Sequence, residues 1–194
     1  MIKFNEGAEG KIYFEKFLGI NLAIKIRTAK HYRINKLDER IRQYRTKREA
    51  KIISVLENKI NTPKLIGFGR YTIVTEKLNG KLLKDIKNKK KYMKSLGAEL
   101  RLMHANKVAH GDFTPANIMI DENTVYVIDF GLSEITEDIE ELALDLLLMK
   151  RSLTKEEYRI LSSSYAKNNA KFSKIINKLN EIELRGRYNL RTLA

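Results

Sequence analysis

The sequence contains no cysteine and only three histidines. The absence of cysteine excludes disulfide bonds, thiolate catalysis and cysteine-ligated zinc, and three histidines leave little scope for a histidine metal site. No apolar run approaches the roughly 20 residues needed to cross a bilayer, and residues 1–6 lack the apolar stretch of a signal peptide. We therefore expect a soluble, cytoplasmic protein with no membrane contact.

Acidic residues are few beside basic ones, 24 against 38, which leaves a formal net charge of +14. An excess of this size favours a polyanionic partner, and RNA is the leading candidate. Much of the excess is local, because eleven Lys or Arg residues lie between Lys25 and Lys51 and a second cluster lies between Lys84 and Lys94. Both clusters are equally consistent with solvated surfaces.

The 194 residues, 43% of them hydrophobic, suffice for two small lobes that share a cleft. Short apolar and β-branched runs predict strands of an antiparallel sheet over 11–14, 22–26, 65–68 and 72–75. Apolar positions at helical spacing predict one long helix, which begins with a cap near Asn35 and ends before Pro63.

Beyond Gly80 the pattern becomes mainly helical. Helices are predicted over 93–103, 137–150 and 154–183, the last with a capping box from Thr154 to Glu157 and a break near residues 168–169. A hairpin that pairs 118–120 with 125–128 interrupts them. The chain is therefore α+β, with a strand-rich N-lobe over residues 1–78, a helical C-lobe over residues 79–194, and a hinge near residues 76–80.

The strongest motif is residues 110–117, HGDFTPAN, followed by Asp129-Phe130-Gly131. Phosphoryl transfer needs a carboxylate that orients the attacking group and oxygen ligands that hold Mg²⁺ on the phosphates of ATP. Asp112 is the candidate catalytic residue, and Asn117 and Asp129 are the candidate metal ligands, which the hairpin should bring side by side. A capped loop and an unrelated turn would explain either half of the motif alone, but not both at this spacing.

Upstream residues supply candidates for the rest of a nucleotide site. Strand alternation points Lys25 away from its apolar neighbours and toward the phosphates, and Glu49 on the long helix is preferred over Asp38 and Glu39 as its partner. The other candidate cofactor-binding residues are Gly7, Ala8, Glu9 and Gly10 in a phosphate-covering loop, and Glu76 and Leu78 in the hinge. A plain two-strand turn would use the same glycines.

Together these motifs, with residues 32–34 and 45–50, resemble the Bud-type small atypical kinase of the KEOPS complex over nearly the whole chain, in an archaeal-like form. The resemblance implies a reduced two-lobed protein-kinase-like fold and an ATPase that is also an atypical serine/threonine kinase. It further implies a role in making threonylcarbamoyladenosine on tRNA, beside a threonylcarbamoyl-transferase subunit and a small regulatory subunit. The family usually has Leu where this chain has Phe113.

The resemblance also implies a basic C-terminal tail, matched here by Arg185 and Arg187. We expect the last helix to end near Glu183 and to be broken by Gly186, so that both arginines extend into solvent and contact RNA.

Two absences near the catalytic motif limit regulation and substrates. Regulated kinases carry Arg where this chain has Gly111, which excludes switching through a phosphorylated activation loop. Only residues 132–136 separate Asp-Phe-Gly from the acidic helix, and no Ala-Pro-Glu segment follows. Water or a residue in cis is therefore the easier phosphoryl acceptor.

Three other functions remain to be weighed. A small-molecule kinase of the aminoglycoside or choline type shares the His-Gly-Asp motif, and acidic residues 134–141 would suit a cationic acceptor, but about 63 residues after Gly131 leave no acceptor subdomain. An RNA-binding module with a dead kinase site would have lost one of Lys25, Asp112, Asn117 or Asp129. A RIO-type ribosome-assembly kinase normally carries an accessory domain, for which we expect no room in 194 residues.

Overall fold

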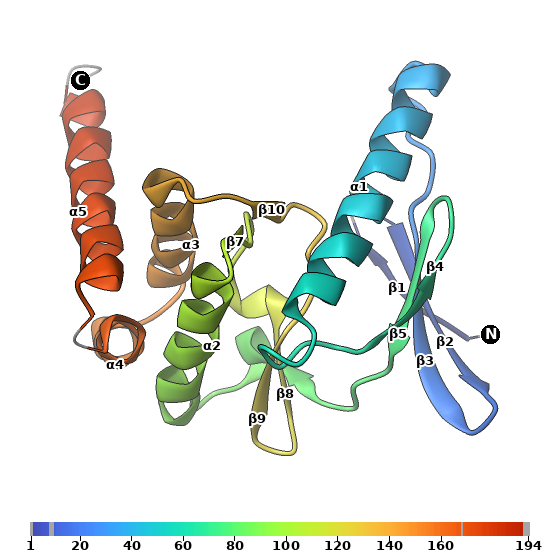
Figure 1. Cartoon of the computed structure of the whole chain (residues 1–194), viewed down its shortest axis with the longest axis horizontal. Coiled ribbons are helices and arrows are strands. Elements are labelled where there is room, and N and C mark those ends of the chain that lie inside the picture. Colours follow the sequence, from blue (N-terminus) through green and yellow to red (C-terminus); the bar gives the residue numbers. More distant parts are fainter. Residues whose placement is uncertain (1, 8–9, 168, 192–194) are drawn as a thin grey trace.

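The computed structural model describes residues 2–7, 10–167 and 169–191, with side chains from residue 10 to residue 185 apart from residue 168. Its first part is a five-stranded antiparallel sheet in the order β1-β2-β3-β5-β4 (Figure 1). The strands are β1 (Ile2–Gly7), β2 (Gly10–Phe17), β3 (Ile20–Ile26), β4 (Leu65–Phe68) and β5 (Thr72–Glu76). The four strands expected between residues 11 and 75 are all present.

One long helix, α1 (Asn35–Leu56), interrupts the sheet strands in sequence, and its N-terminal end projects beyond the sheet (Figure 1). Ile52, Ile53 and Leu56 are at most 4% exposed, so the C-terminal half of the helix is the half that packs. The expected cap at Asn35 is wrong. Ile34 occupies the N-cap position without a side-chain bond, and Asn35 is already helical.

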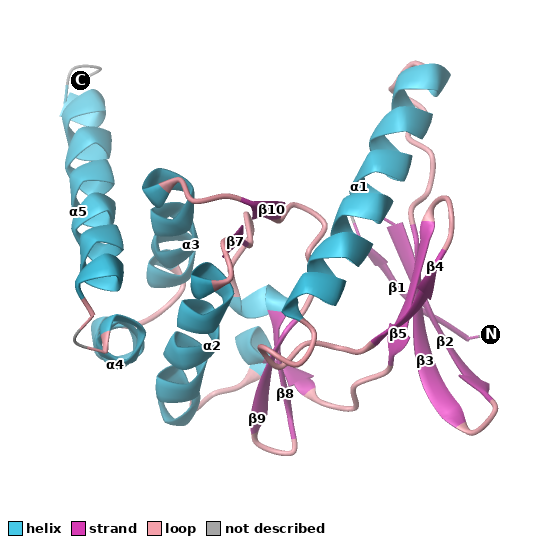
Figure 2. Cartoon of the chain, viewed as in Figure 1, coloured by secondary structure: helices cyan, strands magenta, loops and turns pink. Residues whose placement is uncertain are grey.

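The second part is mainly helical, with a small sheet of order β6-β8-β9 and the short pair β7–β10 (Figure 2). Its helices are α2 (Met93–Ala105), α3 (Ile139–Arg151), α4 (Lys155–Ala166) and α5 (Ala170–Arg191), with 3₁₀ turns at Leu83–Asp85, Lys90–Tyr92 and Pro115–Asn117. Its strands are β6 (Lys81–Leu82), β7 (Val108–Ala109), β8 (Ile118–Asp121), β9 (Thr124–Val127) and β10 (Glu134–Ile135). The α+β class is confirmed, whereas the lobe boundary at residue 78 stays a prediction.

The hairpin β8–β9 closes through a two-residue turn at Glu122 and Asn123. Both residues have positive φ, 45° and 67°, which gives the turn a twist that matches antiparallel strands. The register pairs Ile118 with Val127, so the residues that precede β8 and follow β9 emerge at the same end of the hairpin. This register positions the two candidate metal ligands.

A single hydrophobic core extends from the end of α1 to α5. The predicted stripe of Met93, Leu96, Leu100 and Met103 on α2 is fully buried. Gly97 lies on the same helix where a Cβ atom would meet the Leu161 carbonyl oxygen of α4 at 2.3 Å, so α2 and α4 pack at close range. None of the described helices is long and apolar enough to cross a membrane.

The expected end of the last helix near Glu183 is wrong. The capping box from Thr154 to Glu157 is present, but α5 does not stop near Glu183 and continues through Gly186 to Arg191. One interior glycine costs a helix only about 1 kcal/mol, which packing of a buried face can exceed. Arg185 lies on this helix and pairs with Glu140 at 3.5 Å and with Glu181 at 3.8 Å, while the side chain of Arg187 lies outside the described residues.

Candidate active site

Lys25 on β3 is the central cation of the candidate site. Its Nζ atom lies 3.1 Å from Glu49 Oε1 on α1 and 2.5 Å from Asp129 Oδ1, which follows β9. Glu49, the partner expected for Lys25, is therefore in contact with it. The rejected candidates Asp38 and Glu39 pair instead with Arg42 and Arg70.

Glu49 has a second cationic partner that sequence reasoning missed. Arg27 is two residues beyond Lys25, directly after the end of β3. It is 2% exposed, and its Nη2 donates to Glu49 Oε2 at 2.5 Å. Its Nη1 donates at 3.4 Å to the Oγ1 atom of Thr46, which lies one turn before Glu49 on α1. The two-residue period of a strand was the signal that could have identified it.

The loop over residues 110–117, which we call the catalytic loop, brings Asp112 and Asn117 into direct contact. Asn117 Nδ2 donates to the Asp112 carboxylate and to the Asp112 carbonyl oxygen, both at 2.8 Å. Because the amide nitrogen is occupied in this way, the Asn117 Oδ1 atom is directed elsewhere and is available as an oxygen ligand.

Three buried polar residues hold the catalytic loop from below. Asp145 on α3 is fully buried and accepts from the backbone N–H groups of His110 at 2.6 Å and Gly111 at 2.9 Å. His104 Nε2 lies 3.1 Å from the same Asp145 carboxylate, and His104 Nδ1 lies 2.7 Å from the Tyr165 hydroxyl of α4. The sequence offered no signal for the contact of His104 with Tyr165, because the two residues are 61 positions apart.

Two residues in the site have left-handed backbone conformations. Gly111 has φ of 76°, and a Cβ atom there would meet the Leu132 carbonyl oxygen at 2.7 Å. The same carbonyl accepts a hydrogen bond from Arg48 Nη2 of α1 at 2.9 Å. Asp129, which has a Cβ atom, has φ of 61°. Strain of this kind persists where surrounding contacts impose it, often at functional sites.

The charges of Lys25 and Asp129 stabilise one another. Burial tends to lower the pKa of Lys25, but the carboxylates of Glu49 and Asp129 raise it above its usual value. Burial tends to raise the pKa of Asp129, but Lys25 and the Gly131 N–H group hold it below its usual value. Both groups are therefore charged at neutral pH.

The residues present fit a magnesium ion bound with ATP. Mg²⁺ prefers oxygen ligands and is commonly held by one or two protein side chains together with substrate phosphates. Asn117 Oδ1 and a carboxylate oxygen of Asp129, whose side chain is 43% exposed, would be the protein ligands. An ion held there would neutralise charge on the phosphates.

The remaining predicted residues are placed less directly. Gly7 and Gly10 pair at the β1–β2 turn, while Ala8 and Glu9 lie outside the described residues. At Gly10 a Cβ atom would meet the Ile26 carbonyl oxygen at 2.3 Å, so packing on β3 already requires this glycine. Leu78, in the segment predicted as a hinge, is half-buried.

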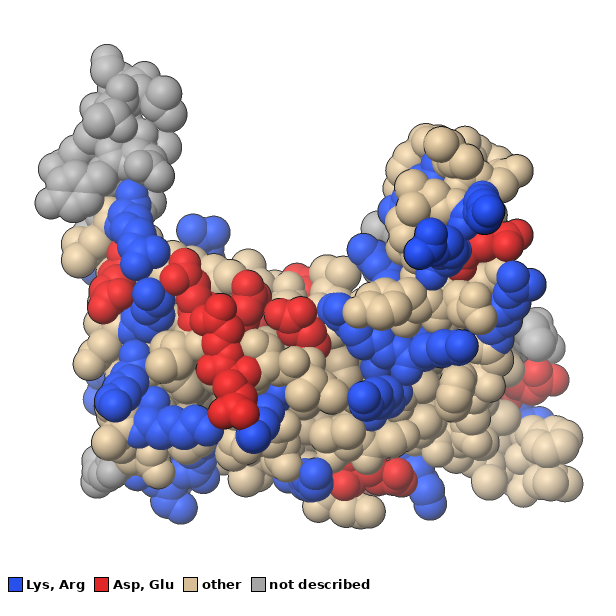
Figure 3. Space-filling model, turned by 45° about the horizontal axis from the view of Figure 1, so that its top comes forward, with Lys and Arg blue, Asp and Glu red and all other residues tan. Residues whose placement is uncertain are grey.

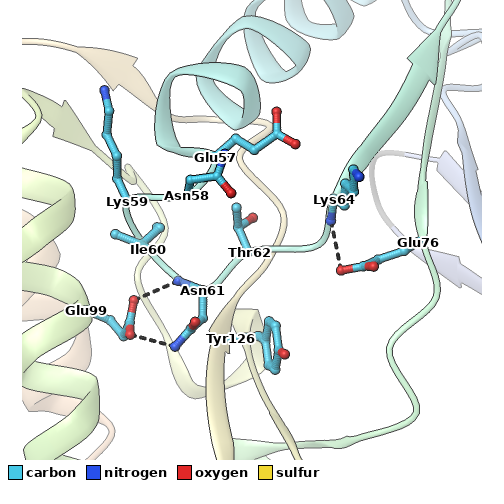
Figure 4. A pocket seen from close by; sticks show the side chains of 10 residues that line it. All are labelled: Glu57, Asn58, Lys59, Ile60, Asn61, Thr62, Lys64, Glu76, Glu99 and Tyr126. Carbon is cyan, nitrogen blue, oxygen red and sulfur yellow. Dashed lines mark hydrogen bonds between the residues drawn. The ribbon is translucent and has the colours of Figure 1, made fainter.

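Glu76 faces a different cavity, of about 480 Å³, in which its carboxylate accepts from the Lys64 N–H group (Figure 4). Glu99, Asn61 and Tyr126 also line this cavity, whereas Lys25, Asp112 and Asp129 do not. Any contact of Glu76 with a nucleotide in the candidate site would therefore come from its backbone.

The fold and the site together define the class of atypical, ATP-using kinases and ATPases. Residues 14–150 match the RIO domain family. The chain is 33% identical to the KEOPS complex subunit Bud32 of Pyrococcus abyssi over 96% of each chain. It thus belongs to the RIO domain family, as a Bud32-type member.

Two further comparisons extend this result. A probable bifunctional tRNA threonylcarbamoyladenosine biosynthesis protein of Methanobrevibacter smithii is 37% identical over 94% of this chain, which spans only 36% of that relative. The Rio2 kinase of Chaetomium thermophilum, solved as an ADP/Mg²⁺-phosphoaspartate complex, superposes with a TM-score of 0.67 at 16% identity, covering 94% of this chain and 70% of the other. On sequence alone, the RIO-type kinase was an alternative to the Bud-type kinase. The family match shows that this chain contains a RIO domain.

Proposed function

We propose that the chain is a magnesium-dependent ATPase, with weaker serine/threonine kinase activity, that serves a KEOPS-type assembly in making threonylcarbamoyladenosine on tRNA in the cytoplasm. The observation that carries the proposal is the pairing of Lys25 with Asp129 and of Asp112 with Asn117. The Ile128 N–H group donates to the Asn117 carbonyl oxygen at 3.0 Å, which holds the two pairs in adjoining segments. The names of the full-length and bifunctional relatives support the assembly and the tRNA.

Each side chain has a distinct part in the proposed reaction. Lys25 moves from Asp129 to the phosphates of ATP, while Arg27 keeps Glu49 and α1 in place. Asp112 accepts a hydrogen bond from the attacking water or hydroxyl and receives its proton as the bond to phosphorus forms. Asn117 orients the Asp112 carboxylate through its amide nitrogen and presents its oxygen to the metal.

The proposed partners are a threonylcarbamoyl-transferase subunit, a small regulatory subunit and tRNA. The bifunctional relatives match this chain along about a third of their length, 36% in one case, so the rest of each relative is available for a second activity. This supports a close association between the ATPase and the tRNA-modifying enzyme. A membrane has no place in the proposal.

The test is ATP turnover with Mg²⁺, measured on the chain alone and then with the transferase subunit and tRNA. Asp112→Asn should lower kcat by about 10²- to 10⁴-fold with little change in nucleotide affinity, because a positioned base acts mainly in the transition state. Asp129→Ala should abolish turnover and leave the fold intact. Near-normal hydrolysis by Asp129→Ala would contradict the proposed metal site.

A small-molecule kinase is the second candidate, and the acidic cluster after the β8–β9 hairpin is the observation in its favour. Several of these carboxylates are already engaged, since Glu137 pairs with Lys107 and Glu140 pairs with Lys178 and Arg185. A cationic acceptor would have to displace these partners. Phosphorylation of an aminoglycoside or choline by the purified chain would establish this second function.

A further inference from the structure

The solvent face of α1 carries a row of four cations around one tyrosine. Lys36, Arg40, Lys47 and Lys51 follow one another at helical spacing with Tyr44 between them, and all five are exposed. We call these five residues the α1 stripe. They span about 22 Å at 1.5 Å per residue. The opposite face of the helix is the one that packs.

The cations of the α1 stripe are available for an external partner. Among the residues that the structure describes, none of these four side chains has an ion pair or hydrogen bond, and the stripe contains no acidic residue. The acidic residues of the helix lie elsewhere: Asp38 and Glu49 are buried beneath the opposite face, and Glu39 pairs with Arg70. Figure 3 shows Lys and Arg gathered over the half that carries α1, whereas the other half carries a band of Asp and Glu beside further Lys and Arg.

A small basic crevice adjoins the helix. It has a volume of about 50 Å³, and its lining includes Lys30, Tyr32, Arg33, Arg42 and Arg45. Asp38 accepts from Arg42 at 2.6 Å and lies 3.6 Å from Arg33, so one carboxylate offsets two guanidinium groups. The crevice therefore retains an excess of positive charge.

Two exposed tyrosines accompany these cations. Tyr32 is 78% exposed and Tyr44 is 61% exposed. Each ring is approached by one guanidinium group, from Arg33 at 5.2 Å and from Arg48 at 5.6 Å. Aromatic rings exposed among cations stack unpaired bases, because every base has a planar face.

We propose that the α1 stripe and the adjoining crevice bind a single-stranded or loop region of RNA, with phosphates along the helix and an unpaired base on Tyr44. The proposal rests on the proposed function only for the identity of that RNA as tRNA. An acidic protein surface is the competing partner, but lysine is depleted at protein interfaces, and three of the four cations in the stripe are lysines. RNA is thus the better match.

The test uses two variants of the full chain with equal net charge. The stripe variant is Lys36→Gln/Arg40→Gln/Lys47→Gln/Lys51→Gln. The matched control, Lys81→Gln/Lys84→Gln/Lys87→Gln/Lys94→Gln, removes four exposed lysines from the other half of the chain. Binding of an unmodified tRNA transcript is measured by fluorescence anisotropy at several salt concentrations.

The stripe variant should bind tRNA about 10²-fold more weakly than wild type near 0.1 M salt. Its slope of log affinity against log salt should be shallower by about 2 to 3, given roughly 0.7 per phosphate contact on single strands. The control should stay within a few-fold of wild type. Equal losses in both variants would reduce the effect to net charge and overturn the proposal, as would retention of the chain by polyglutamate but not by RNA.

A third variant, Tyr44→Leu, tests stacking. It should weaken binding of an unpaired oligonucleotide by about 5- to 100-fold and leave binding of a duplex of equal length unchanged. Equal binding of the oligonucleotide by Tyr44→Leu and wild type would overturn the placement of a base on Tyr44.

ATP turnover of the stripe variant and of its matched control is measured in parallel and should be unchanged, since none of the four stripe cations has an ion pair or hydrogen bond to the candidate site among the residues that the structure describes. A chain that hydrolyses ATP but binds RNA equally with and without the stripe would overturn this inference alone. Stripe-dependent RNA binding without ATP turnover would overturn the ATPase proposal alone.

Discussion

Glu49 is the residue through which two cations hold α1 against the sheet. Lys25 also serves the phosphates in the proposed reaction, whereas Arg27 is buried and has no such task. A carboxylate buried to 3% exposure is costly without a positive partner. Arg27 is therefore the positioning residue that keeps α1 in place while Lys25 is engaged with nucleotide.

Replacement of Arg27 by methionine should lower the free energy of unfolding by about 3 kcal/mol, the scale for removing one member of a buried ion pair. It should also raise KM for ATP, because Lys25 would then be held by Glu49. Urea unfolding and steady-state kinetics measure the two effects. Arg27→Lys is the matched control and should restore KM more than stability, and an unchanged KM in Arg27→Met would refute the positioning role.

The ion pair between Lys25 and Asp129 predicts how stability depends on pH. The pKa of Asp129 is lowered in the folded state, so its contribution is present above the ordinary aspartate pKa of 3.8 and is lost as the pH falls through the lowered value. The pKa of Lys25 is raised from 10.5, so its contribution is present below 10.5 and is lost as the pH rises through the raised value. Stability from this pair should be constant near neutrality.

Lys25→Met should flatten the acid limb of the stability curve, because it removes the charge that lowers the Asp129 pKa. The measurement is the midpoint of thermal unfolding between pH 2 and pH 6, with the exposed substitution Lys84→Met as control. An acid limb as steep in Lys25→Met as in wild type would show that other carboxylates dominate there.

At the scale of elements, three helices meet beneath the catalytic loop through one hydrogen-bonded chain. Burial and the nearby Asp145 charge raise the pKa of Tyr165, so its hydroxyl stays protonated and can donate to His104 Nδ1. With His104 Nδ1 as the acceptor, the Nε2–H group donates to Asp145, which also accepts from the loop amides. Each buried donor in this series of hydrogen bonds has an acceptor.

Tyr165→Phe should therefore cost about 1 to 3 kcal/mol of stability, because it leaves His104 Nδ1 buried without a donor. It should also lower kcat more than it changes KM, since the loop that carries Asp112 loses a support while the nucleotide contacts remain. Denaturant unfolding and ATP turnover test both effects, and exposed Tyr44→Phe is the control. A proportionate loss of active protein with normal kcat per folded molecule would indicate a purely structural role.

At the scale of the whole molecule, α1 is tied directly to the segment after Asp-Phe-Gly. The bond from Arg48 to the Leu132 carbonyl joins them directly. Phosphatase treatment should therefore leave ATP turnover unchanged, both in the chain alone and in the assembled complex. Arg48→Ala should lower turnover where phosphatase does not, and a complex silenced by phosphatase would contradict this account.

Much of the site was predictable because its parts lie at short, fixed spacings. Asp112, Asn117 and Asp129 lie on one loop and one hairpin, so local pattern places them, and the apolar half of α1 identifies Glu49. The helix over residues 184–191 was not predictable. The sequence shows the helix-breaking tendency of Gly186, but it does not show the contacts with distant segments that hold α5. The contact of His104 with Tyr165 likewise joins distant segments and leaves no trace in either sequence neighbourhood.

The contact between Lys25 and Asp129 also bears on the order in which ligands arrive. The Lys25 ammonium group contacts Asp129, one of the two proposed metal ligands, so a divalent ion that arrived without nucleotide would meet another cation there. The phosphates of ATP would attract that ammonium group and would carry the metal with them. We therefore expect the site to bind the metal–nucleotide complex in preference to the bare ion.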